Sequence, residues 1–98
     1  MTKSEKEFQS KVRAQGCIVC ILDLNERSDG DIHHILNGNR RIGEMDVLCL
    51  CPSHHRFGID NEIATSRHPY LARFVKRYGT EAQLLAKTKE LLSGGDGV

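Results

Sequence analysis

Long apolar runs are missing from this sequence, and so is a strong excess of one charge. No stretch approaches the ~20 consecutive apolar residues of a membrane-spanning helix. The opening residues, MTKSEKEF, do not resemble a secretory signal, so we expect a cytoplasmic protein without a membrane partner. The net charge of +1 argues against nucleic-acid binding through bulk positive charge, although local basic patches are compatible with it.

Internal repeats, low-complexity tracts and linkers are also missing, which predicts a single domain over residues 1–93 with a disordered tail at 94–98. A domain of this size buries only roughly 60–65% of its unfolded surface, so we expect an additional cross-link. The chain has four cysteines, but disulfides do not persist in a reducing cytosol. Closely spaced cysteines are then better explained as metal ligands or as a redox pair.

The pattern of capping residues, turn formers and apolar positions predicts an α+β fold. Helices are expected in three places, each ended by a glycine: residues 4–15, 69–78 and 81–92. Ser4 with Glu7, and Thr80 with Gln83, have the spacing of a capping box. Strands are predicted at two places, separated by a loop: residues 31–36 and 46–50. A short helix with Ser53 as its N-cap is expected after the second strand.

Two short pairs of cysteine and histidine ligands stand about thirty residues apart. Cys17 and Cys20 form a C-x-x-C pair, and Cys51 and His54 form a C-x-x-H pair. Each tight turn presents two ligands on one side, so the two pairs together predict a tetrahedral structural zinc site. A redox pair is the weaker alternative, because the βαβ setting of a thioredoxin-like motif is missing. Cys49 lies between apolar neighbours, and we expect a buried free thiol there.

Four histidines remain if zinc uses His54, and three of them stand in the two histidine pairs. Neighbouring residues of a strand face opposite sides, so His33 and His34 cannot share one role in one pocket unless the strand twists or ends there. One of them can bind a second metal while the other acts on a substrate, and His55 can reach that metal from the following helix. The alternative is a set of strand and surface histidines with satisfied hydrogen bonds. His68, ahead of a proline, is expected to cap a helix or to pack, with a role as a third metal ligand as the alternative.

The order of these motifs resembles the HNH endonuclease family, whose core is the ββα-metal or His-Me finger. The shared features are C-x-x-C, HHI at a strand end, a loop, and a return strand that runs into L-C-x-x-H-H and a helix. The run LCPSHHRFG, followed by ATSRHPYLARFVKRYG and an LLA helix, is similar to the phage recombination-enhancement (Ref) group of these nucleases. The similarity covers about residues 16–92. Many members have cysteine at the fourth zinc position, where this chain has histidine.

The resemblance implies a metal-dependent DNA endonuclease with a zinc-stabilised ββα-metal core and flanking N-terminal and C-terminal helices. It makes His34 the general base, and it makes His33 and His55 the ligands of a catalytic Mg²⁺ or Mn²⁺. Two imidazole ligands also accept Zn²⁺, so zinc could replace the working metal in crystals. Asp46 aligns with the asparagine that orients the base. The alternatives for this orienting role are two loop asparagines, Asn37 and Asn39.

The same resemblance implies a phage or prophage gene, a protein that works in the bacterial host cell, and action on DNA bound by the RecA filament. Arg40, Arg41 and Arg56 are expected to contact DNA phosphates, because they neighbour the histidine motifs. Two other functions are compatible with the zinc ligands: a non-catalytic module that binds DNA or a recombination protein, and a structural component of a larger phage assembly. The sequence does not predict the oligomeric state.

Overall fold

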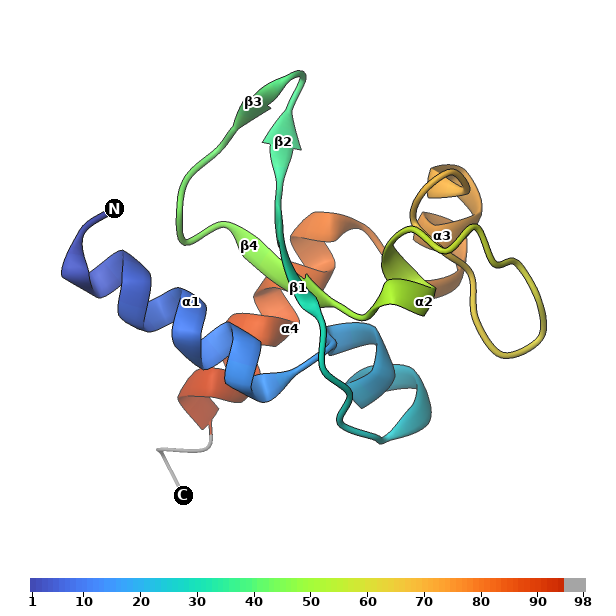
Figure 1. The fold of residues 1–98 in the computed structure, drawn as a ribbon, viewed down its shortest axis with the longest axis horizontal. Helices are drawn as coiled ribbons and strands as arrows, with labels where there is room; N and C mark the ends of the chain where they lie inside the picture. Colours follow the sequence, from blue (N-terminus) through green and yellow to red (C-terminus); the bar gives the residue numbers. More distant parts are fainter. Residues whose placement is uncertain (95–98) are drawn as a thin grey trace.

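The computed structural model describes residues 1–94, in which helices surround a small antiparallel sheet (Figure 1). The helical elements are α1 (Lys3–Gln15), the π-helical turn η1 (Cys20–Leu24), α2 (Pro52–His55), α3 (Leu71–Tyr78) and α4 (Glu81–Gly94). The strands are β1 (Asp31–His34), β2 (Leu36–Asn37), β3 (Arg40–Arg41) and β4 (Val47–Leu50). The predicted α+β class is confirmed. Apart from the last residue of α4, the predicted tail falls outside the described residues.

Strands β1 and β4 form the central antiparallel pair, and every residue of β4 is buried. One face of β4 carries Leu48 and Leu50, which pack in a cluster with residues from η1, α3 and α4. The other face carries Val47 and Cys49, which pack against Val12 of α1. Burial on both faces explains why β4 is a continuous apolar run rather than an alternating one. Within the described residues, none of the helices is long and apolar enough to cross a membrane.

The chain enters β1 in close contact with the end of β4. A Cβ atom at Gly30 would lie 2.5 Å from the backbone carbonyl of Leu50, so this approach requires glycine. The backbone N–H of Cys17 donates to the carbonyl of Ser28 in the same segment, at 2.9 Å. These contacts hold the C-x-x-C turn beside the C-x-x-H turn that follows β4.

The first helix begins earlier than predicted. Its capping box is formed by Thr2 and Glu5, not by Ser4 and Glu7: the Thr2 Oγ1 accepts from the Glu5 N–H at 3.1 Å, and the Glu5 carboxylate accepts from the Thr2 N–H at 2.7 Å. The same spacing of hydroxyl and carboxylate occurs twice at the N-terminus, and the earlier pair adds two residues of helical backbone bonds. The capping box predicted before α4 is confirmed.

Two further helix starts differ from the prediction. The N-cap of α2 is Cys51 rather than Ser53, because Pro52 occupies the first helical position, where its missing N–H costs nothing. Helix α3 begins at Leu71, two residues after Pro69. The two residues before Pro69 donate their backbone N–H groups to carbonyls of α2 at 2.8 and 2.9 Å, which keeps this segment against α2 instead of in a helix.

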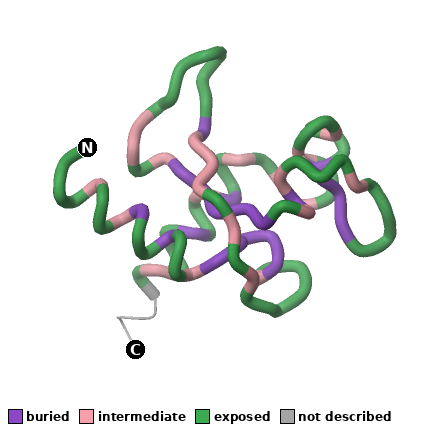
Figure 2. The backbone as a smooth tube through the Cα atoms, viewed as in Figure 1, coloured by how far each residue is buried: buried purple, intermediate pink, exposed green. Residues whose placement is uncertain are grey.

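The predicted loop between the two central strands contains a hairpin. Asn37 of β2 lies opposite Arg40 of β3, so the turn has two central residues. Gly38 is the first of them and has a φ of +68°, which suits a type II′ turn. Figure 1 shows this hairpin projecting from the helical body, and Figure 2 shows it as exposed.

Candidate metal centres and active site

The four predicted zinc ligands lie together in what we call the cysteine cluster: Cys17, Cys20, Cys51 and His54. All four residues are buried, and their ligand atoms lie within 4.8 Å of one another. The Cys20 and Cys51 Sγ atoms are 3.7 Å apart, and the Cys51 Sγ lies 3.1 Å from the His54 Nδ1. Zn–S bonds of about 2.3 Å in a tetrahedron place two sulfurs roughly 3.8 Å apart. The arrangement therefore fits a structural zinc ion.

Protonation in the cysteine cluster is set by burial. Burial raises the pKa of Cys17 and of Cys20 above the ordinary thiol value, and it lowers the pKa of His54. The imidazole is therefore neutral near pH 7, as a metal ligand must be. The two thiols need a bound cation to stabilise their thiolate forms. The hydroxyl of Ser28, which donates to the Cys20 Sγ at 3.0 Å, gives further support to a negative sulfur.

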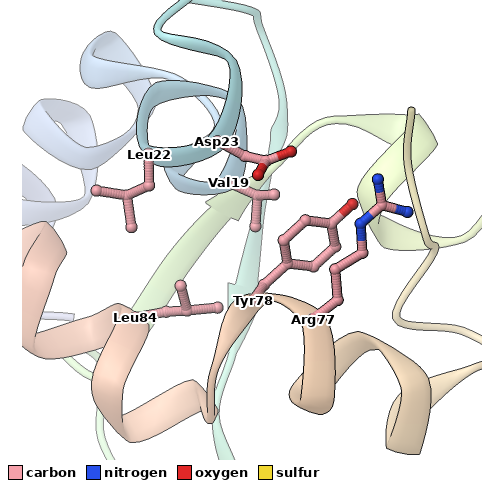
Figure 3. A pocket seen from close by; sticks show the side chains of 6 residues that line it. All are labelled: Val19, Leu22, Asp23, Arg77, Tyr78 and Leu84. Carbon is pink, nitrogen blue, oxygen red and sulfur yellow. The ribbon is translucent and has the colours of Figure 1, made fainter. Parts of the chain in front are cut away.

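Tyr78 of α3 packs against the cysteine cluster. Its ring meets the His54 ring edge to face at 5.3 Å between centroids, and its hydroxyl accepts from the Thr65 N–H at 3.0 Å. With Asp23 of η1 and Arg77, Tyr78 also lines a cavity of about 200 Å³ whose remaining walls are aliphatic (Figure 3). Tyr78 thus joins η1 and α3 beside the zinc ligands.

A second group of side chains, the histidine cluster, is formed by His33, His55 and Glu81. The rings of His33 from β1 and His55 from α2 meet edge to face, with 5.2 Å between centroids. The His55 Nδ1 is buried and has no hydrogen-bond partner among the described residues. Burial, followed by the charge of His33, lowers the pKa of His55, so this ring is neutral near pH 7. The structure therefore brings together the two residues predicted to share a metal.

The carboxylate of Glu81, the first residue of α4, completes the histidine cluster. Its Oε2 lies 3.4 Å from the His33 Nε2, and its Oε1 accepts from the Arg67 Nε at 2.6 Å. The side chains of Glu81 and His33 are only 15% and 11% exposed. Burial acts to raise the pKa of Glu81, but the hydrogen bonds to His33 and Arg67 outweigh it and lower that pKa. The carboxylate is therefore ionised at neutral pH.

His34 contacts a different carboxylate from His33, as the alternation of side chains along a strand requires. The His34 Nε2 lies 3.2 Å from the Glu44 Oε2, which also accepts from the Gln9 Nε2 at 3.2 Å. The hydrogen bond with His34 is the main cause of the lowered pKa of Glu44. Asp46, the predicted orienting residue, has its carboxylate 3.6 Å from the Lys89 Nζ, and its backbone carbonyl accepts from the residue after His34.

The three predicted phosphate-binding arginines are exposed at two places. Arg40 and Arg41 form β3 of the projecting hairpin, and the Arg41 Nη1 lies 3.7 Å from the Glu44 Oε1. Arg56 follows α2 directly, with its Nη2 3.7 Å from the Asp31 Oδ2. Both places therefore adjoin the elements that carry the histidines, since Asp31 begins β1 and Glu44 contacts His34.

Two other residues considered from the sequence lie outside both clusters. Cys49 is a buried free thiol, as predicted, and burial raises its pKa to about 11. It packs with Val12, in a different apolar cluster from Cys51. The chain leaves the strand at Cys51 to start α2. His68 is exposed, and the N-cap of α3 is Tyr70, so a capping role for His68 is wrong.

Sequence reasoning missed both carboxylates that contact the histidines. Glu81 was visible only as the first residue of a predicted helix, and Glu44 only as a loop acid two residues before Asp46. No short spacing connects either carboxylate to its histidine. Glu81 is 48 residues from His33 in the chain, so the contact follows from tertiary packing.

Comparison with known proteins identifies a family that covers nearly the whole chain. A family model described as "Recombination enhancement, RecA-dependent nuclease" matches residues 1–93, which include every residue of the cysteine and histidine clusters. A search of curated proteins gave no match. The resemblance to the Ref group is confirmed by the extent of the family match. The chain therefore belongs to the family of recombination enhancement, RecA-dependent nucleases.

Proposed function

We propose that this protein is an HNH-type endonuclease that hydrolyses phosphodiester bonds in DNA during RecA-dependent recombination. The family match supports a nuclease connected with RecA. The order β1, β4, α2, with a zinc-type cluster at its base, supports the HNH core. The observation that carries the proposal is the meeting of the His33 and His55 rings at 5.2 Å, outside the cysteine cluster.

His33 and His55 are the proposed ligands of the catalytic divalent metal, which we expect to be Mg²⁺ or Mn²⁺. This assignment is supported by the buried, unpartnered Nδ1 of His55 and by the neutral state of its ring. A divalent ion bound there supplies Lewis-acid stabilisation of the phosphate oxygens. The two rings would hold such an ion beside β1 and α2, because both project from short, hydrogen-bonded elements.

His34 is the proposed general base that deprotonates the attacking water. Histidine is the side chain best suited to accept a proton near neutral pH. In the proposed tautomer, the His34 Nε2–H donates to Glu44, which leaves Nδ1 to accept a proton from water. Glu44 is therefore our first candidate for the residue that orients the base, and Asp46 is the second. A positioned base of this kind contributes about 10²- to 10⁴-fold to the rate.

The proposed DNA contacts come from Arg40, Arg41 and Arg56. A two-stranded hairpin that projects from the body and carries two exposed arginines can follow a phosphate backbone. We further propose that residues 1–93 act as one domain and that the protein works on RecA-bound DNA in the cytoplasm of a bacterial host of the phage or prophage.

The test compares the wild type with His34→Ala on plasmid and single-stranded DNA, with and without RecA, in Mg²⁺ or Mn²⁺. We expect cleavage to fall by about 10²- to 10⁴-fold. One bound zinc per chain and the thermal unfolding midpoint should stay unchanged. His68→Ala is the matched control, since this exposed histidine lies outside both clusters. Equal residual cleavage in the wild type and His34→Ala would contradict the proposal and favour a non-catalytic zinc module.

A further inference from the structure

We infer that Glu81 is a third protein ligand of the divalent metal, and that Arg67 holds the second oxygen of its carboxylate. The inference rests on the proposed function, because it concerns the same metal. Glu81 lies outside the ββα unit formed by β1, β4 and α2. It is the first residue of α4, the second helix after α2 in the chain. The site would then contain two imidazoles and one carboxylate.

The position of His33 is the first argument. The His33 ring contacts the His55 ring, and the His33 Nε2 lies 3.4 Å from the Glu81 Oε2. His33 therefore contacts both other members of the histidine cluster. The start of α4 is held by its capping box and by Leu84 and Thr88, which are fully buried. The carboxylate is therefore presented to His33 by an anchored helix end.

The two distances from Glu81 are the second argument. Its bond to the Arg67 Nε, 2.6 Å, is as short as a charge-assisted hydrogen bond, whereas the 3.4 Å to the His33 Nε2 is longer than such bonds. Two ligand atoms bound to one ion at about 2.1 Å lie roughly 3.0–3.5 Å apart, depending on the geometry. The His33–Glu81 spacing therefore fits a shared cation as well as the long hydrogen bond that the two side chains form without one.

The unpartnered nitrogen of His55 is the third argument. Buried polar atoms are nearly always satisfied, and the exceptions mark bound ions, waters or functional groups. Here the buried Nδ1 of His55 belongs to the same cluster as a carboxylate whose side chain is only 15% exposed. A cation bound between them would interact with the carboxylate and satisfy the Nδ1 of His55 at the same time.

The donor set has a consequence for metal choice. Mg²⁺ prefers oxygen ligands and keeps several bound waters. Mn²⁺ accepts both imidazole and carboxylate ligands, so it binds more tightly than Mg²⁺ to a site that contains both. With Glu81 as a ligand, the zinc-loaded protein is expected to bind Mn²⁺ more tightly than Mg²⁺. Arg67 acts through Glu81 as a positioning residue, because it fixes the orientation of the carboxylate.

The experiment measures Mn²⁺ binding to the zinc-loaded full chain by calorimetry and by electron paramagnetic resonance, without DNA. Glu81→Gln should lower the Mn²⁺ affinity by more than about tenfold, and Arg67→Gln by a smaller factor. Glu90→Gln is the control, because this glutamate lies on the same helix with its side chain 67% exposed. Zinc content and thermal unfolding without Mn²⁺ are measured for each variant. If Glu81→Gln does not fold, Glu81→Asp, which keeps the charge with a shorter reach, must show the loss instead.

The outcomes separate this inference from the proposed function. Unchanged Mn²⁺ affinity in folded Glu81→Gln, together with lost affinity in His33→Ala, would overturn the third ligand and leave the nuclease proposal standing. Mn²⁺ binding that depends on Glu81, in a protein that cuts no DNA, would support the site and contradict the nuclease. Loss of thermal stability alone, at unchanged affinity, would reduce Glu81 to a structural partner of Arg67.

Discussion

His54 and His55 are consecutive residues, yet they belong to two centres of different character. The His54 ring is buried among three cysteines, and the cysteine cluster it belongs to forms part of the apolar core. The His55 ring lies beside His33, in a cluster whose other partner is a carboxylate. The short helix α2 separates the two side chains because successive residues of a helix point in different directions.

The cluster that would stabilise this small domain is thus separate from the cluster that we propose to carry its chemistry. The cysteine cluster joins η1 to α2 across the core, where a cation would act as a cross-link. The histidine cluster is polar and keeps 11% and 15% of the His33 and Glu81 side chains exposed, so it lies nearer to solvent than the cysteine cluster. A soft, sulfur-rich set suits zinc, whereas imidazole with carboxylate accepts harder, catalytic cations. The following predictions test this division.

The largest effect is expected from Cys20→Ala. Structural zinc contributes an apparent ~10–16 kcal/mol, which is comparable with the whole stability of a domain, about 5–15 kcal/mol. We therefore expect no cooperative thermal unfolding at all, as monitored by circular dichroism. His33→Ala is the contrasting variant, since it should unfold cooperatively with one zinc bound. A cooperative unfolding transition of wild-type size in Cys20→Ala would contradict a structural role for the zinc ion.

Acid should weaken zinc binding in the cysteine cluster. Burial raises the pKa values of Cys17 and Cys20, so zinc binding must release thiol protons, and a falling pH opposes it. The apparent zinc affinity should fall about tenfold per pH unit for each proton released, as measured with a coloured chelator between about pH 7.5 and about pH 5.5. An affinity independent of pH would contradict thiolate ligation.

Glu44→Gln tests which residue orients the proposed base. Loss of the carboxylate beside His34 should lower kcat by about tenfold to a hundredfold with little change in KM. Asp46→Asn should have the smaller effect, since its carboxylate lies near Lys89. A larger loss of kcat in Asp46→Asn than in Glu44→Gln would assign the orienting role to Asp46.

Arg40→Ala should weaken DNA binding without affecting either metal centre. One phosphate contact fewer predicts a several-fold weaker affinity and a salt dependence whose slope is smaller by about one. Lys76→Ala, which removes an exposed cation from α3, is the control. Equal losses in the two variants, measured by fluorescence anisotropy at several salt concentrations, would argue against a specific role of the hairpin.

The smallest effect is expected from Cys49→Ala. This thiol is buried outside the cysteine cluster, so its removal should lower the free energy of unfolding by about 1 kcal/mol. For a domain of this size, that corresponds to roughly 4–8 °C in the thermal midpoint. Zinc content, measured by mass spectrometry, should remain one per chain. A reduced zinc content would place Cys49 among the ligands.

Features that depend on short spacing could be predicted from the sequence alone. The C-x-x-C and C-x-x-H turns, the glycines that end the helices, and the capping box before α4 each need residues at most four positions apart. The alternation along β1 similarly determined that His33 and His34 would have different partners. Two local patterns competed at each misplaced helix start, and the sequence did not show that Thr2 and Cys51 would be the caps.

Which acids meet the histidines depends on tertiary packing. Glu44 and Glu81 reach His34 and His33 because a loop folds back onto β1 and because α4 packs against β4, the partner strand of β1. Such contacts depend on the closure of long loops and on the burial of apolar faces, which no short motif encodes. The zinc ligands could therefore be predicted from spacing, whereas the carboxylates beside the histidines emerged only from the packing of elements far apart in the chain.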